Sequence, residues 1–154
     1  MDAVDRKIIA LLQDEGRLTF TDLAGRVNLS VSRCQRRVRE LETAGAITGY
    51  HATVRPDLLG YGFEVLAFAT LLSAGAVKEF DAALAEVPEV IEAQRLFGEP
   101  DYLIRIVSAD LGAYQELYEN VLSQLPGVRS LNSTIVMKHA VPPRPVPARP
   151  PARA

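Results

Sequence analysis

The sequence predicts an α+β protein in which a helical N-terminal domain precedes a domain of alternating strands and helices. Apolar residues recur at helical spacing over the first 45 residues, with capping residues before each run. Apolar runs of strand length then alternate with two helical patterns over residues 63–138. Residues 55–62, with one proline and two glycines, separate the two patterns and are predicted to be a linker.

Three short helices are predicted in the N-terminal domain. Asp2 is suited to cap the first helix, which ends before Gly16. Thr19 and Asp22 form a pattern similar to a capping box and begin the second helix. A tight connection follows, and Ser30 can cap a third helix that runs to about residue 44. Two helices joined by so few residues are typical of a helix-turn-helix unit.

Residues 46–54, AITGYHATV, are predicted to form two short strands around Gly49 and Tyr50. Such a pair of strands after three helices would be a small wing. The sequence therefore predicts a winged helix-turn-helix domain over residues 1–54.

The second domain is predicted to be a ferredoxin-like sandwich. Strands are expected at 63–73, 90–97, 102–108 and 128–138, and helices at 77–87 and 111–125. The order βαββαβ gives an antiparallel sheet with two helices on one face. The helix at 111–125 has an apolar stripe made of Leu111, Tyr114, Leu117, Tyr118, Val121, Leu122 and Leu125.

Both faces of the first strand of this sheet carry apolar side chains. Val65 and Ala67 lie on one face, and Leu66 and Phe68 lie on the other. Because the two helices can cover only one face, we expect the open face to pack on another subunit.

The composition excludes several classes of protein. No apolar run approaches the roughly 20 residues that a membrane span needs. The acidic N-terminus does not resemble a signal peptide, and the single cysteine, Cys34, permits neither an internal disulfide nor a zinc cluster. These features predict a cytoplasmic protein without membrane association.

Charge is distributed unevenly along the chain. The net charge of −2 divides into +1 over residues 1–60, −6 over residues 61–138 and +3 over residues 139–154. Residues 26–39 contain five arginines and no carboxylate. A local basic stripe on a mildly acidic protein is compatible with nucleic-acid binding. The last 16 residues, rich in proline and arginine, are predicted to be a disordered tail, for which weak phosphate contact is one possible role.

The stretch SVSRCQRRVRE, residues 30–40, has three interpretations: a reactive thiol among cations, a solvated helix face, or a surface for phosphate. Steps of about 100° per residue place Val31, Cys34, Val38 and Leu41 on one side, which buries the cysteine. A solvated face would mix charges of both signs, but the first turns here carry only positive charge.

DNA contact is therefore the favoured interpretation of this third helix. The residues predicted to bind DNA are Ser30, Ser32, Arg33, Arg36, Arg37 and Arg39. Arg36 lies opposite the apolar side, whereas Arg37 lies at the boundary and could brace either a phosphate or a neighbouring helix.

The sequence resembles the Lrp/AsnC (feast/famine, leucine-responsive) family of transcription regulators over about residues 3–138. The segments that carry the resemblance are DRKIIALLQDEGR, DLAGRVNLSVSRCQRRVRELETAGAITGY, GEPDYLIRI and LPGV. The resemblance implies a winged helix-turn-helix that binds double-stranded DNA and a βαββαβ domain, residues 63–138, for effector binding and oligomerisation. It also implies dimers that assemble further, into tetramers or octamers, and a small-molecule effector such as an amino acid.

The resemblance places effector binding at the turn formed by Gly98, Asp101 and Tyr102. Gly98 allows a close backbone approach, and Asp101 could pair with the α-ammonium group of an amino acid. The alternative is that Asp101 only bonds the backbone of its own turn.

The sequence is also compatible with two other functions. The first is an enzyme on a dimeric ferredoxin-like scaffold, for which Tyr102 and Arg105 are the only candidates, and these should point to opposite faces. The second is an amino-acid-binding assembly module that does not bind DNA. No catalytic residue, cofactor or metal site is predicted, because His51 and His139 lack partners at metal-ligand spacing and are expected to be a wing and a tail residue.

Overall fold

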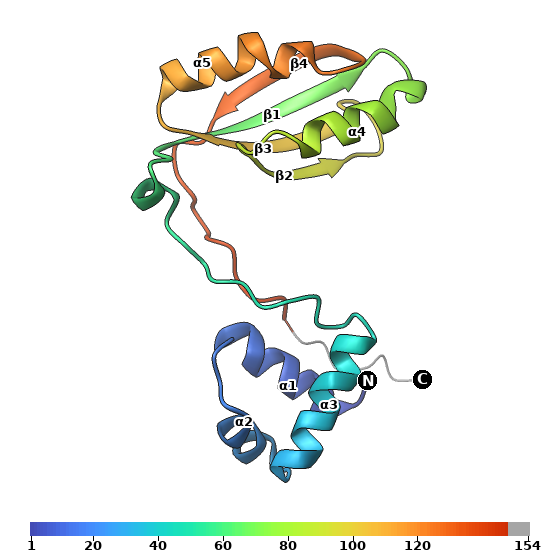
Figure 1. The fold of residues 1–154 in the computed structure, drawn as a ribbon, viewed down its shortest axis with the longest axis vertical. Coiled ribbons are helices and arrows are strands. Elements are labelled where there is room, and N and C mark those ends of the chain that lie inside the picture. Colours follow the sequence, from blue (N-terminus) through green and yellow to red (C-terminus); the bar gives the residue numbers. More distant parts are fainter. Residues whose placement is uncertain (148–154) are drawn as a thin grey trace. The chain divides into compact units, whose positions relative to one another are not determined.

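A computed structural model describes residues 1–147 of the chain, which divides into two units (Figure 1). The first unit contains Met1–Thr53 together with the described residues from Val141 onward. The second unit is Val54–Ala140. The predicted tail at 139–154 extends past the described residues, and its described part from residue 141 has no helix or strand.

The first unit is built from three helices, as predicted. They are α1 (Ala3–Asp14), α2 (Phe20–Val27) and α3 (Val31–Thr43). Asp2, Thr19 and Ser30 cap them, each accepting a hydrogen bond from the backbone N–H three residues further on. Each cap satisfies a donor that the first helical turn leaves free, so these polar residues set where the helices begin.

A short turn joins α2 to α3. Asn28 has a φ of 55°, in the left-handed region, and its N–H bonds to the carbonyls of Ala24 and Gly25. Asparagine tolerates this conformation better than most residues, which lets α2 end abruptly, so that only three residues separate it from α3. The predicted helix-turn-helix is therefore present.

The three helices enclose a small apolar core. Its buried members are Ile8, Leu23, Ala24, Val27, Cys34, Val38 and Leu41. The prediction that Val31 belongs to this core was wrong, because its side chain is 39% exposed. Val31 is the first residue of α3, at the edge of the bundle, and the partly buried Leu29 of the preceding turn contacts the core instead.

The two strands predicted in residues 46–54 do not form, and this segment is irregular. Ala46 and Ile47 donate backbone hydrogen bonds to the carbonyl of Leu41, and Ile47 contacts the helical core. The Tyr50 hydroxyl donates to Glu42 at 2.9 Å. An isolated two-stranded hairpin is only marginally stable, and here contacts to the helices hold the chain instead.

The second unit is a four-stranded antiparallel sheet with two helices, in the predicted order βαββαβ. Its elements are β1 (Phe63–Leu71), α4 (Val77–Ala85), β2 (Val90–Arg95), β3 (Tyr102–Ser108), α5 (Leu111–Asn120) and β4 (Val128–Ile135). The strand order is β2-β3-β1-β4, and α4 and α5 cover the same face of the sheet (Figure 1). A 3₁₀ turn, Pro56–Leu59, lies within the predicted linker.

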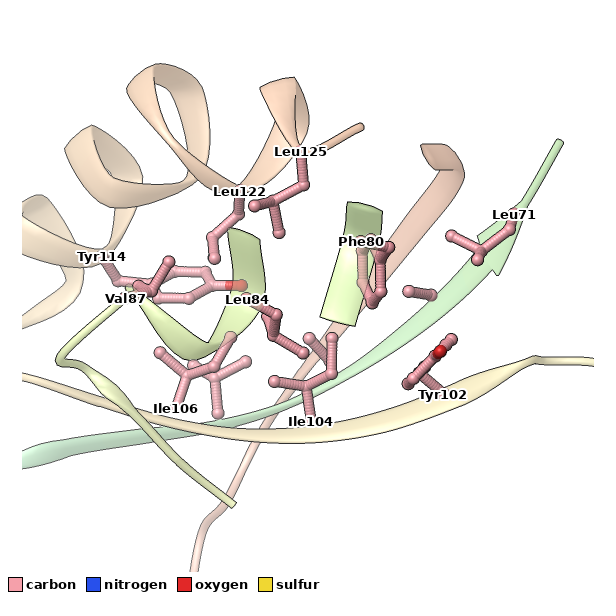
Figure 2. Packing of buried hydrophobic residues seen from close by; sticks show 13 residues of the cluster. Leu71, Phe80, Leu84, Val87, Tyr102, Ile104, Ile106, Tyr114, Leu122 and Leu125 are labelled. Atoms are coloured by element: carbon pink, nitrogen blue, oxygen red, sulfur yellow. The ribbon is translucent and has the colours of Figure 1, made fainter. Parts of the chain in front are cut away.

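The core of this unit lies between the sheet and the two helices (Figure 2). Val65, Ala67 and Ala69 of β1 and Ile104 and Ile106 of β3 alternate toward the helices and are at most 1% exposed. The predicted apolar stripe of the last helix is only partly correct. Tyr114, Leu122 and Leu125 are buried, but Leu111, the first residue of α5, and Val121 are exposed. Val121 follows the end of α5 at Asn120, where a 3₁₀ turn replaces the predicted helix.

Candidate nucleic-acid interface and effector turn

The exposed face of α3 is polar and basic, and its opposite face is apolar. Ser32, Arg33, Arg36 and Arg39 are exposed, whereas Cys34 is fully buried. Burial raises the pKa of the Cys34 thiol, so this sulfur is neither accessible nor poised to become a thiolate. The interpretation as a reactive thiol is thereby excluded, and the arginines are left as a surface.

The charges on this face are available to a ligand. Arg36 pairs with Glu40 one turn further along the helix at 2.7 Å, and both side chains are more than half exposed. Such an exposed pair contributes little to stability, so a phosphate can displace the carboxylate. Within residues 1–147, neither Arg33 nor Arg39 has an ion-pair partner.

Arg37 lies apart from this basic face. Its guanidinium contacts the carboxylates of Asp5 at 2.6 Å and Asp2 at 2.8 Å, which form the N-terminal capping box of α1. Hydrogen bonds to Asp5 and Asp2 raise the pKa of Arg37, and the Asp5 backbone N–H together with Arg37 lowers the pKa of Asp2. Of the two roles considered for Arg37, the structure places it as a brace between α3 and the start of α1.

Ser30 and Ser32 have different surroundings at the start of α3. The Ser30 hydroxyl accepts the Arg33 backbone N–H at 3.4 Å and lies 3.3 Å from the Ser32 hydroxyl. Ser30 is therefore committed to the helix cap, whereas Ser32 remains directed outward beside the arginines.

The predicted effector turn follows β2. Gly98 has a φ of +131° and open space around its Cα, so this position favours glycine for its backbone conformation. Asp101 accepts the Leu71 backbone N–H on Oδ2 at 2.7 Å, and its own N–H donates to the carbonyl of Ala69 at 2.9 Å. The turn is thus tied to the end of β1, and one carboxylate oxygen of Asp101 has no hydrogen-bond donor within residues 1–147.

Tyr102 points away from this turn, into the core beneath α4. It is 2% exposed, its ring centroid lies 4.7 Å from that of Phe80, and its hydroxyl donates to Asp81 at 2.6 Å. Burial and the Asp81 carboxylate raise the pKa of Tyr102 to about 12. The structure therefore brings Gly98 and Asp101 together but separates the Tyr102 side chain from them.

Arg105 lies on the opposite face of β3, as predicted. It pairs with Glu64 of β1 at 2.6 Å, and this ion pair and the His139 ring hold the pKa of Glu64 below its usual value. His139, predicted to be a tail residue, lies 2.9 Å from Glu64. The alternation of β1 and β3 places Glu64 and Arg105 on one face, but nothing in the sequence specified that His139 would join them.

Two further features of the turn were not predicted. Phe97 is completely exposed, and Glu99 forms an ion pair with Arg129 of β4. Within residues 1–147, no group of His, Cys, Asp and Glu is arranged to hold a metal ion. No helix in this described part is long and apolar enough to cross a membrane.

Comparison with known families decides the class of protein. Residues 1–48 match the family model for a winged helix-turn-helix DNA-binding domain, and residues 66–146 match that for the Lrp/AsnC ligand-binding domain. The chain belongs to the Lrp/AsnC family of transcription regulators. The predicted family and fold class are thereby confirmed, and the chain is a DNA-binding regulator rather than an enzyme on a ferredoxin-like scaffold.

Individual Lrp/AsnC proteins resemble this chain over most of its length. The Bkd operon transcriptional regulator of Pseudomonas aeruginosa is 34% identical, with 90% of this chain and 92% of the relative covered. A leucine-responsive regulatory protein of Haemophilus influenzae is 36% identical, with 90% and 84% covered. A transcriptional regulator of Neisseria meningitidis, solved in complex with L-methionine, superposes with a TM-score of 0.89 at 32% identity and covers 96% of each chain.

Proposed function

We propose that this Lrp/AsnC regulator inserts α3 into the major groove of DNA and contacts it through Ser32, Arg33, Arg36 and Arg39. The observation that carries the proposal is the one-sided face of α3, where exposed arginines lie opposite a buried apolar stripe. Arginine can bind guanine edges or phosphates, and the residues nearest the N-terminus of a recognition helix contact base edges. Ser30 and Arg37 support this surface as a cap and a brace.

Selection from random duplexes tests the proposal. The full chain should enrich a pseudo-palindromic or repeated sequence, because a symmetric oligomer presents two copies of α3. Affinity for the selected duplex should fall steeply between 50 and 300 mM salt, since each phosphate contact contributes about −0.9 to the slope of log K against log salt. An assembly module that does not bind DNA would enrich no sequence.

The effector we propose is an amino acid bound at the turn around Gly98 and Asp101. The free oxygen of Asp101 suits an α-ammonium group, and the glycine allows close backbone approach. The relatives named for leucine and solved with L-methionine favour an amino acid with an apolar side chain. The buried Tyr102 would act indirectly, by holding α4 against the strand that follows the turn.

An Asp101→Asn variant tests this site. The amide oxygen can still accept the Leu71 N–H, so the turn should keep its structure, but the negative charge that would pair with the ligand is lost. We expect amino-acid binding to weaken about tenfold or more while DNA binding without effector stays unchanged. Isothermal titration with L-methionine and L-leucine measures the effect, with Glu99→Gln as a control in the same turn. Undiminished binding by Asp101→Asn would make Asp101 a structural residue only.

We further propose that the regulatory units pair through the open face of the sheet, to form dimers and then tetramers or octamers. Leu66 and Phe68 of β1 and Leu103 of β3 are only partly buried on this face, and neither helix covers it. A patch of this kind is typical of a subunit interface.

A Phe68→Asp variant should weaken this dimer about 100-fold or more, because a charge would be buried where an aromatic ring packs. Sedimentation equilibrium measures the change, and Lys78→Asp on the exposed side of α4 is the matched control. A Phe68→Asp protein that remained as associated as the control would exclude this face as the dimer interface.

A further inference from the structure

A free amino acid carries two opposite charges, and Asp101 suits only one of them. Its unbonded carboxylate oxygen can accept from an α-ammonium group, but an α-carboxylate needs a donor of its own. A cation at the same end of the sheet would supply that donor. Two arginines of the regulatory unit border the turn: Arg95 ends β2, and Arg129 lies at the start of β4.

The backbone of β4 is irregular at Arg129. Thr70 of β1 pairs with Ser130 of β4. The next residue of β1, Leu71, pairs with Val128. Arg129 lies between these two residues of β4 and has no partner on β1. An extra residue of this kind is a β-bulge, which redirects a side chain and is common beside functional sites.

The bulge places the Arg129 side chain against the turn. Its guanidinium forms an ion pair with Glu99, two residues before Asp101. The end of β1 connects the two sides through Leu71. The Leu71 N–H donates to Asp101 at 2.7 Å, and its partner on β4, Val128, directly precedes Arg129. Because neighbouring strands are only about 4.8 Å apart, the acid and the cation flank a space one strand wide.

The ion pair between Arg129 and Glu99 is open to exchange. The Arg129 side chain is 53% exposed and that of Glu99 is 72% exposed. Within residues 1–147, Arg129 has no other ion-pair partner. Since an ion pair in water contributes little to stability, the carboxylate of a ligand can replace that of Glu99.

Arg95 is placed differently, although it is equally close to the turn in the sequence. It lines a groove beside α4 together with Asp81 and Tyr102. None of residues 98–101 lines this groove. Arg95 therefore serves as a matched comparison for Arg129, with the same charge at the same end of the sheet but a different position.

We propose that Arg129 binds the α-carboxylate of the effector while Asp101 binds its α-ammonium group, with the ligand carboxylate replacing that of Glu99. This rests on the proposed binding of an amino acid at the turn and adds the residue that recognises its second charge. A guanidinium can hold a carboxylate through two parallel hydrogen bonds. A site with both charges selects a free amino acid over an amide or a keto acid, each of which lacks one of them.

Isothermal titration of the full chain with L-methionine, L-leucine and their amides, at about pH 6, tests the proposal. The amides keep a protonated α-amino group at this pH but have no carboxylate. We expect Arg129→Gln to bind the two amino acids about tenfold more weakly, because a charged hydrogen bond is lost. It should bind the amides as the wild type does. Arg95→Gln is the control and should match the wild type for all four ligands.

Glu99→Gln, the control for Asp101→Asn, removes the competing carboxylate and should bind L-methionine about threefold more tightly. Weaker binding by this variant would contradict the exchange.

Wild-type affinity of Arg129→Gln for both amino acids would overturn the proposal and leave the carboxylate to backbone N–H groups of the turn. An equal loss for amino acids and amides would also overturn it, because the effect would then be on the structure of the turn. An equal loss in Arg95→Gln would reduce it to general electrostatic attraction and overturn it as well. If the wild type itself bound neither amino acid, the proposed effector function would fail, so the two failures are distinguishable.

Discussion

An Arg36→Ala, Arg39→Ala double variant is expected to bind its selected DNA site about 30-fold more weakly or worse. Both side chains lie on the exposed face of α3, and neither contributes to the apolar core. A well-placed arginine contact to a base edge is worth roughly 1–3 kcal/mol, so the loss of two amounts to at least about 2 kcal/mol. Within residues 1–147, the only ion pair removed is that of Arg36 with Glu40, which is exposed and contributes little to folding.

The measurement is an anisotropy titration of the selected duplex at fixed salt. A Lys78→Ala, Arg129→Ala variant is the control, because it removes the same net charge from the regulatory unit instead. Circular dichroism and sedimentation should match the wild type for both proteins. Equal affinity of the α3 variant and the control would exclude α3 as the recognition helix.

A Phe80→Ala variant is expected to lose about 3–5 kcal/mol of unfolding free energy in the regulatory unit. Phe80 extends from α4 into the core, where it is fully buried and contacts the Tyr102 ring (Figure 2). Truncation leaves a cavity and also loosens the packing that directs Tyr102 toward Asp81. Amino-acid binding should therefore weaken together with stability.

Urea denaturation followed by circular dichroism measures this loss. A Leu72→Ala variant is the matched control, since Leu72 is 69% exposed and its truncation should change stability by less than about 0.5 kcal/mol. A loss below about 1 kcal/mol in Phe80→Ala would contradict the packing described for this core.

Helices and strands whose apolar residues recur with a clear helical or strand period could be predicted from the sequence. The strand Tyr102–Ser108 has the predicted bounds, because its side chains alternate and its ends are marked by a turn and by the Asp110 cap. The helical period likewise predicted the burial of Cys34 correctly. Periodicity failed at the helix end, where Val31 has the right angle but no neighbouring element to cover it.

Contacts between distant parts of the chain were not predictable. Arg37 pairs with Asp2 and Asp5, which lie more than 30 residues earlier in the sequence. Helical periodicity could place Arg37 only at the boundary between the apolar and the polar side of α3. The wing strands failed for a related reason, since contacts of Ile47 and Tyr50 with the helices replaced pairing between strands. At the effector turn, the sequence identified Gly98 and Asp101 as neighbours, but the inward direction of Tyr102 depends on how α4 packs.

The effect of amino acids on DNA affinity is the most direct test, because it depends both on effector binding by the regulatory unit and on DNA binding by the helix-turn-helix unit. Binding of the full chain to its selected duplex should be measured with each of the twenty amino acids in turn. We predict that L-methionine, L-leucine or a similar apolar amino acid changes the Kd for DNA about fivefold or more, and that DNA changes the affinity for that amino acid by the same factor. A DNA affinity that no amino acid alters would contradict the account.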